Sequence, residues 1–207
     1  MTIPHFTPDG FLPPIRPGAT AIAFDRSPYQ ASTAEVARAF ATTEERRVIF
    51  RGFLTLRADL RGLGFASGFH WLDGSFVEDC ERLHLRAPGD IDVVSFLSFS
   101  EVVDTSTPAA LIAFLQANAE IFKSQQSKVK YGVDHYPMEL GGPLDGARVK
   151  LISYWYSIWS HRRDDQRWKG FVRVDLGEDD TSALAILEHA SAAAATDHAS
   201  RETRHEI

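Results

Sequence analysis

WLDGSFVEDCERLHLRAPGDIDVV, residues 71–94, is the stretch that decides the fold and indicates where a functional site would lie. It opens in an apolar run that predicts a strand, and the pair Gly74 and Ser75 follows that strand. A polar spacer separates this pair from an Asp-Ile-Asp motif that leads into a second apolar run. Because side chains alternate along a strand, Asp90 and Asp92 point to the same face of the second strand.

These residue types suit a metal ion and a phosphate group. Two neighbouring carboxylates repel each other, so both stay ionised only where a cation lies between them. Oxygen ligands of this kind favour Mg²⁺, which completes its shell with water and substrate phosphates. Gly74 allows a phosphate to approach the backbone, and a helix that begins at Ser75 would direct free N–H groups at it. The alternative interpretation is an ordinary edge strand preceded by a turn at residues 73–75.

Gly74, Ser75, Asp90 and Asp92, with these apolar flanks and this spacing, resemble the signature of the polymerase-beta-like nucleotidyltransferase superfamily. The resemblance implies an α/β (α+β) fold in which helices flank a small mixed sheet. It also implies a third acidic residue on a neighbouring strand, and we assign that place to Asp134 in the segment KYGVDHYPM. The three aspartates would then be the catalytic residues and the ligands of two Mg²⁺ (or Mn²⁺) ions bound with a nucleoside triphosphate. The alternative for Asp134 is a solvated aspartate at the end of a strand.

The first 30 residues are rich in proline and aromatic residues, which predicts an extended N-terminal arm over residues 1–30. Its Ile-Pro-His-Phe and Gly-Phe-Leu-Pro-Pro segments, together with Leu-Asp-Gly-Ser-Phe at residues 72–76, resemble a group of uncharacterised bacterial and phage proteins. That group has no assigned reaction, so the second resemblance supports the fold and names no substrate. We expect a nucleotidyltransferase-like domain over residues 31–180, and a C-terminal helix with a frayed tail over residues 181–207.

A local excess of positive charge lies between residues 148 and 173, where seven basic residues and two acidic ones give +5, although the chain carries −6. Basic side chains neutralise a bound triphosphate, and we nominate Lys169 first and Arg163 second as nucleotide-binding residues. The alternative is a basic helix end that satisfies the helix dipole. The aromatic residues from Tyr154 to Trp159, which precede the basic run at residues 161–169, have helical spacing that is typical of a buried core stripe more often than of a base-stacking platform.

Composition sets limits on the class of protein. The net charge of −6 does not favour a long nucleic-acid partner, although a local basic patch could bind one. We find no apolar run of 18 residues and therefore expect no membrane span. The single cysteine, Cys80, excludes an internal disulfide and fits a reducing cytoplasm, and we expect it to pack in the core. Its spacing from His84 provides two ligands at most, which is too few for a zinc site.

Apolar periodicity predicts a helix over residues 43–63 with a buried stripe of Ile49, Phe53, Leu56, Leu60 and Leu63. The arginines of this helix would form a solvated face: Arg46, Arg47, Arg51, Arg57 and Arg61. A second helix that begins at Thr107-Pro108 would bury Leu111, Ile112, Phe114, Leu115 and Ile121. The strand that carries Asp134 would begin at about Val129, with His135 structural on its other face.

The resulting expectation is a metal-dependent transfer of an NMP group from a nucleoside triphosphate to a hydroxyl of RNA, a protein or a small molecule. Asp134 would accept the proton of the attacking hydroxyl. The alternative is a catalytically silent protein of this fold, acting as an antitoxin or regulatory subunit with a toxin-type partner protein. Phosphohydrolysis at the same acidic residues is a third possibility. The intact motif at Gly74, Ser75, Asp90 and Asp92 favours the enzyme.

Overall fold

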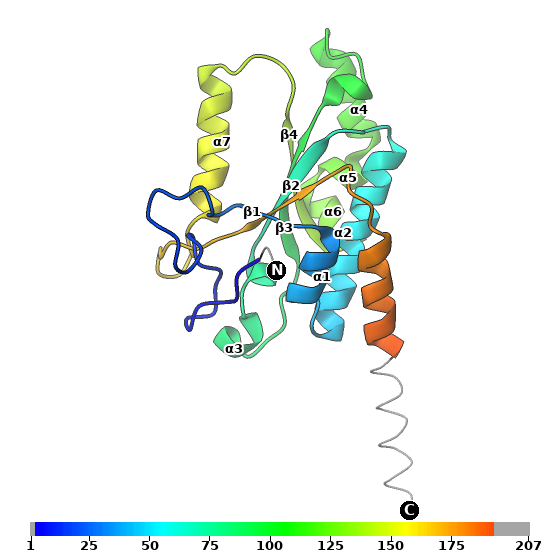
Figure 1. Ribbon diagram of the computed structural model, residues 1–207. Coiled ribbons are helices and arrows are strands. Elements are labelled where there is room, and N and C mark those ends of the chain that lie inside the picture. Colours follow the sequence, from blue (N-terminus) through cyan, green and yellow to red (C-terminus); the bar gives the residue numbers. More distant parts are fainter. Residues whose placement is uncertain (1–2, 193–207) are drawn as a thin grey trace, which may run out of the picture.

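The computed structural model describes residues 3–192, and within them a five-stranded mixed sheet is flanked by helices (Figure 1). The strand order is β1-β5-β2-β3-β4, and β2 is antiparallel to both of its neighbours, whereas β1 pairs with β5 and β3 with β4 in parallel. This architecture confirms the expected α/β class. The strands are β1 Tyr29–Gln30, β2 Gly68–Asp73, β3 Ile91–Leu97, β4 Val133–Glu139 and β5 Val172–Asp175.

Most helices lie on one face of the sheet, and α7 alone of the labelled helices stands on the other face (Figure 1). The helices are α1 Thr33–Phe40, α2 Glu44–Gly62, α3 Cys80–His84, α4 Pro108–Ala117, α5 Ala119–Phe122, α6 Ser124–Tyr131 and α7 Gly146–Trp159. Residues 181–192 are also helical, whereas the predicted frayed tail falls largely on residues 193–207, outside the described part. No helix within residues 3–192 has the length and apolar character needed to cross a membrane.

Strand alternation divides the buried residues into two clusters. The larger cluster lies between the sheet and the helices α1, α2 and α5, and includes Leu72, Val93 and Val133 together with Phe53 of α2. The smaller cluster lies on the α7 face of the sheet and consists of Trp71, Val94, Phe96, Met138, Trp159 and Phe171. Residues of odd parity in β2 and of even parity in β3 and β4 therefore face α7.

The arginines of α2 contradict the expected solvated face. Arg57 is fully buried, and its Nε lies 3.0 Å from Oδ1 of Asp180. The carboxylate of Asp180 also accepts a hydrogen bond from the guanidinium of Arg61 at 2.6 Å. Arg46 is 3% exposed and donates to Glu81 and to the carbonyl of Phe76, both at 2.7 Å. A buried guanidinium persists where carboxylates and carbonyls satisfy its five donors. The prediction was wrong because these partners lie up to 123 residues away along the chain.

Two further elements differ from expectation. The segment before β4 is helical, because α6 continues to Tyr131 and ends at Gly132, whose positive φ of 68° suits a left-handed C-cap. The predicted strand is therefore correct only from Val133 onward. The second expected helix breaks into α4 and α5, and Ile112 of α4 is 54% exposed instead of buried.

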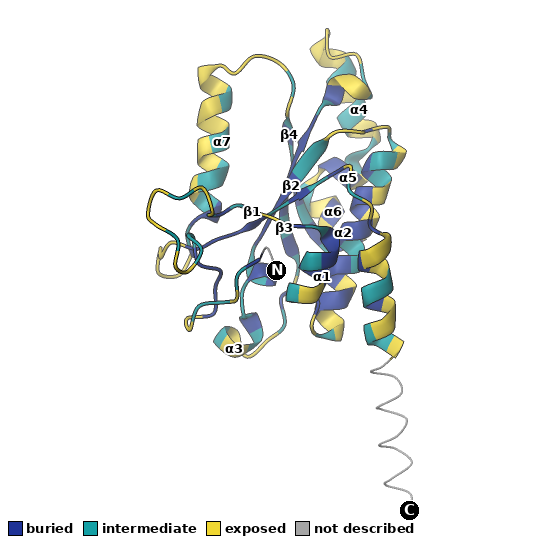
Figure 2. Ribbon diagram, viewed as in Figure 1, coloured by how far each residue is buried: buried dark blue, intermediate teal, exposed yellow. Residues whose placement is uncertain are grey.

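Helix α7 also buries less than its aromatic stripe predicted. Trp159 at its C-terminal end is buried, whereas Tyr154 and Leu151 are about half exposed (Figure 2). This helix covers only part of its sheet face, since Ile152 and Trp155 pack on the smaller cluster while the opposite side of the helix faces solvent. The stripe therefore reflects a one-sided contact of a peripheral helix.

On the face of the sheet that packs against α1, α2 and α5, buried polar side chains form a hydrogen-bonded chain across β4, β3 and β2. The carbonyl of Ile121 can only accept, so Nδ1 of His135 donates to it at 2.6 Å, and Nε2 of His135 accepts from Ser95 at 2.7 Å. Nδ1 of His70 then donates to the same hydroxyl oxygen at 2.8 Å. Burial lowers the pKa of His135 to about 4 and that of His70 well below its usual value. His135 is structural, as expected from its strand parity.

These buried histidines predict a loss of stability in mild acid. The unfolded chain protonates His135 near its ordinary pKa of 6.5, but the folded chain does so only near 4, so stability falls as the pH drops between these values. From pH 7 to pH 5 this group costs about 2 kcal/mol. In urea unfolding, His135→Gln should lower stability at pH 7 but reduce the loss between pH 7 and 5 by about that amount. The exposed control His84→Gln should keep the wild-type pH dependence, and an unchanged slope in His135→Gln would contradict the assignment.

Candidate functional site

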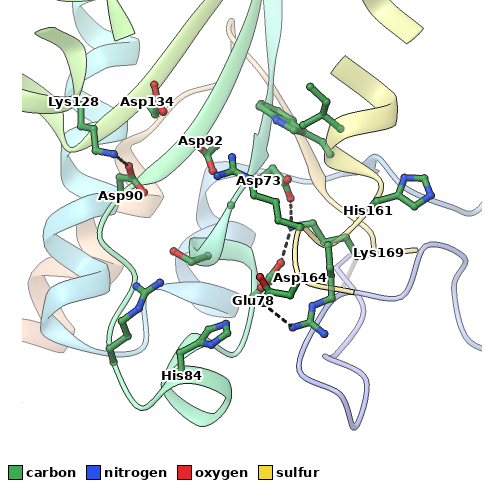
Figure 3. A pocket seen from close by; sticks show the side chains of 17 residues that line it. Asp73, Glu78, His84, Asp90, Asp92, Lys128, Asp134, His161, Asp164 and Lys169 are labelled. Atoms are coloured by element: carbon green, nitrogen blue, oxygen red, sulfur yellow. Dashed lines mark hydrogen bonds and ion pairs between the residues drawn. The ribbon is translucent and has the colours of Figure 1, made fainter. Parts of the chain in front are cut away.

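A row of three aspartates crosses the adjacent strands β2, β3 and β4. Asp73 of β2 is paired in register with Asp92 of β3, and Asp92 is in register with Asp134 of β4. Strand parity places all three on the α7 face, beside the smaller cluster. Asp90 lies two residues before Asp92, and Figure 3 shows the four carboxylates around one pocket.

The pocket has a volume of about 280 Å³, and its wall combines an acidic floor with a basic rim. The strand ends supply the floor. The end of α3 and the loops after α3 and α7 supply rim residues that include His84, Arg86, His161 and Arg163. Small-molecule sites span roughly 300–1,000 Å³, so this pocket suits ions and phosphate groups better than an enclosed whole nucleotide. It brings together every site residue that the sequence nominated: Gly74, Ser75, Asp90, Asp92, Asp134, Arg163 and Lys169.

The turn after β2 is in contact with the acidic floor. Gly74 has a φ of 80°, and a Cβ built on it would lie 2.2 Å from Oδ2 of Asp92, so a side chain there would have to displace the Asp92 carboxylate. Ser75 begins only the single 3₁₀ turn Ser75–Val77. The expected helix at Ser75 is therefore wrong, and the backbone at Gly74 approaches Asp92 closely because glycine has no side chain.

Burial and like charge act together on the floor. Burial, followed by repulsion from Asp90, raises the pKa of Asp92 to about 6, and the nearby guanidinium of Arg163 opposes that rise. Burial likewise raises the pKa of Asp73 to about 7, against the attraction of Lys169. Burial is the main cause in both cases, and the further contribution of Asp90 to the pKa of Asp92 is one that a cation between these two carboxylates would offset.

Lys169 lies at the bottom of the pocket and is held by two carboxylates. Its Nζ is 2.9 Å from Asp73 and 2.7 Å from Glu78; the contact with Asp73 is an ion pair whose angles fall short of a good hydrogen bond. Burial opposes its charge, but these two carboxylates raise its pKa. Lys169 thus lines the pocket as predicted, yet its ammonium is already engaged with side chains.

Sequence reasoning missed Asp73 and Glu78. One signal pointed to Asp73, because it continues the odd-numbered face of β2 on which Phe69 and Trp71 lie. Glu78 carried no comparable signal, since its role depends on Lys169, which is 91 residues away along the chain.

The remaining carboxylates contact protein partners. Asp134 accepts from the hydroxyls of Ser124 and Tyr136, the latter at 3.1 Å, and Asp90 forms an ion pair with Lys128 of α6. Across residues 3–192, no group of three or more His, Cys, Asp or Glu side chains is gathered closely enough to hold a metal ion. The donor set is all oxygen, which suits Mg²⁺ or Mn²⁺, but the side chains would have to leave some of these partners to bind one.

The fold and pocket define an α/β protein with an acidic floor at the ends of three strands. The chain belongs to a family of unknown function, DUF6932, which matches residues 4–175. No curated protein and no solved structure matches the chain. The matched range includes residues 4–30 of the arm, the whole sheet and every residue of the pocket floor.

Replacement of Gly74 by alanine should disrupt the floor. The added Cβ would collide with Asp92 and would also impose a left-handed backbone on a residue that disfavours it, at a cost of about 1–3 kcal/mol. Thermal denaturation should show this loss. The matched control is Gly89→Ala, because nothing lies within 4 Å of its added Cβ, and it should denature like wild type. Equal stability of Gly74→Ala and Gly89→Ala would refute the close approach.

Removal of the Lys169 ammonium should destabilise the fold strongly. Lys169→Met leaves the buried Asp73 and the partly buried Glu78 without their cation, and breaking a buried pair costs about 3–5 kcal/mol. Urea unfolding at pH 8 measures this loss. The control Lys150→Met changes an exposed lysine and should remain within about 0.5 kcal/mol of wild type. A loss below about 1 kcal/mol in Lys169→Met would show that the ion pairs do not hold the floor.

Proposed function

We propose that the protein is a metal-dependent nucleotidyltransferase that moves an NMP group from a nucleoside triphosphate to a hydroxyl acceptor. The observation that carries this proposal is the register that aligns Asp92 with Asp134, beside the Gly74 turn. It supports the roles implied by the resemblance of Gly74, Ser75, Asp90 and Asp92 to the superfamily signature, and a cytoplasmic setting would supply the triphosphate.

Asp90, Asp92 and Asp134 would hold Mg²⁺ or Mn²⁺, and two ions bound with the triphosphate are the expected complement. Such ions supply charge neutralisation for the phosphates and activation of the attacking oxygen. Asp134 is oriented by Ser124 and Tyr136 and would accept the proton of the acceptor hydroxyl. Burial, and after it the charge of Asp90, raises the pKa of Asp92 and so disfavours its ionised form. A cation bound between the carboxylates would favour that ionised form.

The basic residues divide the remaining work. Arg163 is exposed at the rim and acts electrostatically on Asp92, so it would neutralise the triphosphate. Lys169 would attract the nucleotide electrostatically from the bottom of the pocket without contacting it directly, since its ammonium is paired with Asp73 and Glu78. Gly74 and the backbone at Ser75 would approach the terminal phosphates. The acceptor is a hydroxyl of RNA, a protein or a small molecule, and the experiment below separates these classes.

A catalytically silent binding protein, an antitoxin or regulatory subunit with a toxin-type partner, is the second candidate. The observation that favours it is that Asp90 is paired with Lys128 and Asp134 with two hydroxyls, so each acid has a protein partner. A silent protein would bind a partner without consuming a nucleotide.

The test incubates the protein with each nucleoside triphosphate labelled on the α-phosphate, Mg²⁺, and in turn RNA, protein extract or small alcohols. We expect label transfer and pyrophosphate release, both abolished by EDTA. Asp92→Asn should reduce the rate at least about 100-fold, whereas the exposed control Asp104→Asn should not change it. Release of inorganic phosphate would indicate hydrolysis instead. Absence of both transfer and any Mg²⁺-dependent thermal shift with a nucleotide would favour the silent protein.

A further inference from the structure

Two lysines enter the pocket in different settings (Figure 3). The side chain of Lys169 is 5% exposed and lies between two carboxylates, Asp73 and Glu78. The side chain of Lys128 is 53% exposed and forms one ion pair, with Asp90. Lys128 is the solvent-exposed member of its pair, although the Asp90 side chain is only 18% exposed, so its ammonium can exchange a single contact for water. Lys169 is buried between two carboxylates and cannot do so. Lys169 is therefore a fixed cation, and Lys128 is a cation that can leave.

Lys128 also occupies the place where a metal ion would be needed. It extends from α6 to the end of the acidic row at which Asp90 precedes β3. The hydrogen bond that Lys128 donates to Asp90 is the largest cause that raises the Lys128 pKa, and the charges of Asp90, Asp134 and Asp92 raise it further. A single positive charge thus lies within reach of the same three aspartates that the proposed function assigns to the metal.

We propose that Lys128 is an exchangeable counter-cation of the site: its ammonium neutralises Asp90 in the metal-free chain, and a divalent cation bound by Asp90, Asp92 and Asp134 displaces it. The released side chain then faces the mouth of the pocket, where it meets the phosphates of the incoming nucleotide. The proposal rests on the proposed function for the position of the metal. It adds a regulatory step, because metal and nucleotide binding become coupled through one side chain.

The chain offers a matched control on the same helix. Lys130 lies two residues further along α6, and its Nζ contacts Glu120 at 2.8 Å and Asp59 at 3.4 Å, outside the pocket lining. Its side chain is 41% exposed, close to the 53% of Lys128. The two lysines therefore differ mainly in whether they contact the acidic floor.

The first measurement is the binding of Mn²⁺ to the full chain, followed by electron paramagnetic resonance. Lys128→Met removes the competing ammonium and should tighten Mn²⁺ binding about three- to tenfold. Lys130→Met should bind Mn²⁺ as wild type does. Unchanged or weaker binding in Lys128→Met would overturn the proposal, as would the failure of the wild-type chain to bind Mn²⁺.

The second measurement is the chemical modification of each lysine, quantified by mass spectrometry with and without Mg²⁺. Release from Asp90 should make Lys128 more reactive when Mg²⁺ is present, while Lys130 stays constant and Lys169 stays protected. Equal reactivity of Lys128 in both conditions would overturn the exchange. Neither measurement requires turnover, so a chain that exchanges Lys128 but transfers no nucleotide would refute the proposed function alone.

Discussion

Burial of aspartates that lie side by side on adjacent strands is the constraint on which the acidic floor depends. Strand pairing places Asp73, Asp92 and Asp134 side by side, and burial raises the pKa of the first two. A sheet tolerates such a row only where cations lie close to it. The chain meets this need from two directions, with Lys169 at the Asp73 side and Lys128 at Asp90.

The same solution recurs on the opposite side of the molecule, away from the pocket. Arg57 of α2 is fully buried and is compensated by Asp180 and by the carbonyls of residue 175 at the end of β5 and residue 178 just after it. In both places a buried charge joins segments that are distant in sequence. Hydrophobic burial forms the two clusters, and these charged contacts fix which segments lie against each other.

Local patterns in the sequence predicted the parts of the site that depend on local geometry. Strand alternation and the Gly74 turn placed Asp92 on the α7 face of β3 beside the turn, because parity and backbone freedom are properties of a few consecutive residues. Asp90 lines the same pocket but lies one residue before β3 and not on the strand. The burial of Arg57 and the engagement of Lys169 could not be predicted, since each depends on partners about 90 to 120 residues away. The exposure of α7 was missed for a related reason: periodicity identifies an apolar face but not how much of it is covered.

The position of Lys169 late in the chain has a consequence for the order in which the protein is made. Ribosomal synthesis proceeds from the N-terminus, so the acidic row is complete once β4 at Val133–Glu139 has emerged. At that stage Asp73 and Glu78 still lack their lysine, and β2 lacks its neighbour β5. The nascent domain therefore lacks the cation for Asp73 and Glu78 until about 30 further residues are added. Lys169 emerges just before β5, so the acidic residues gain their counter-ion at nearly the same time as the sheet gains this strand.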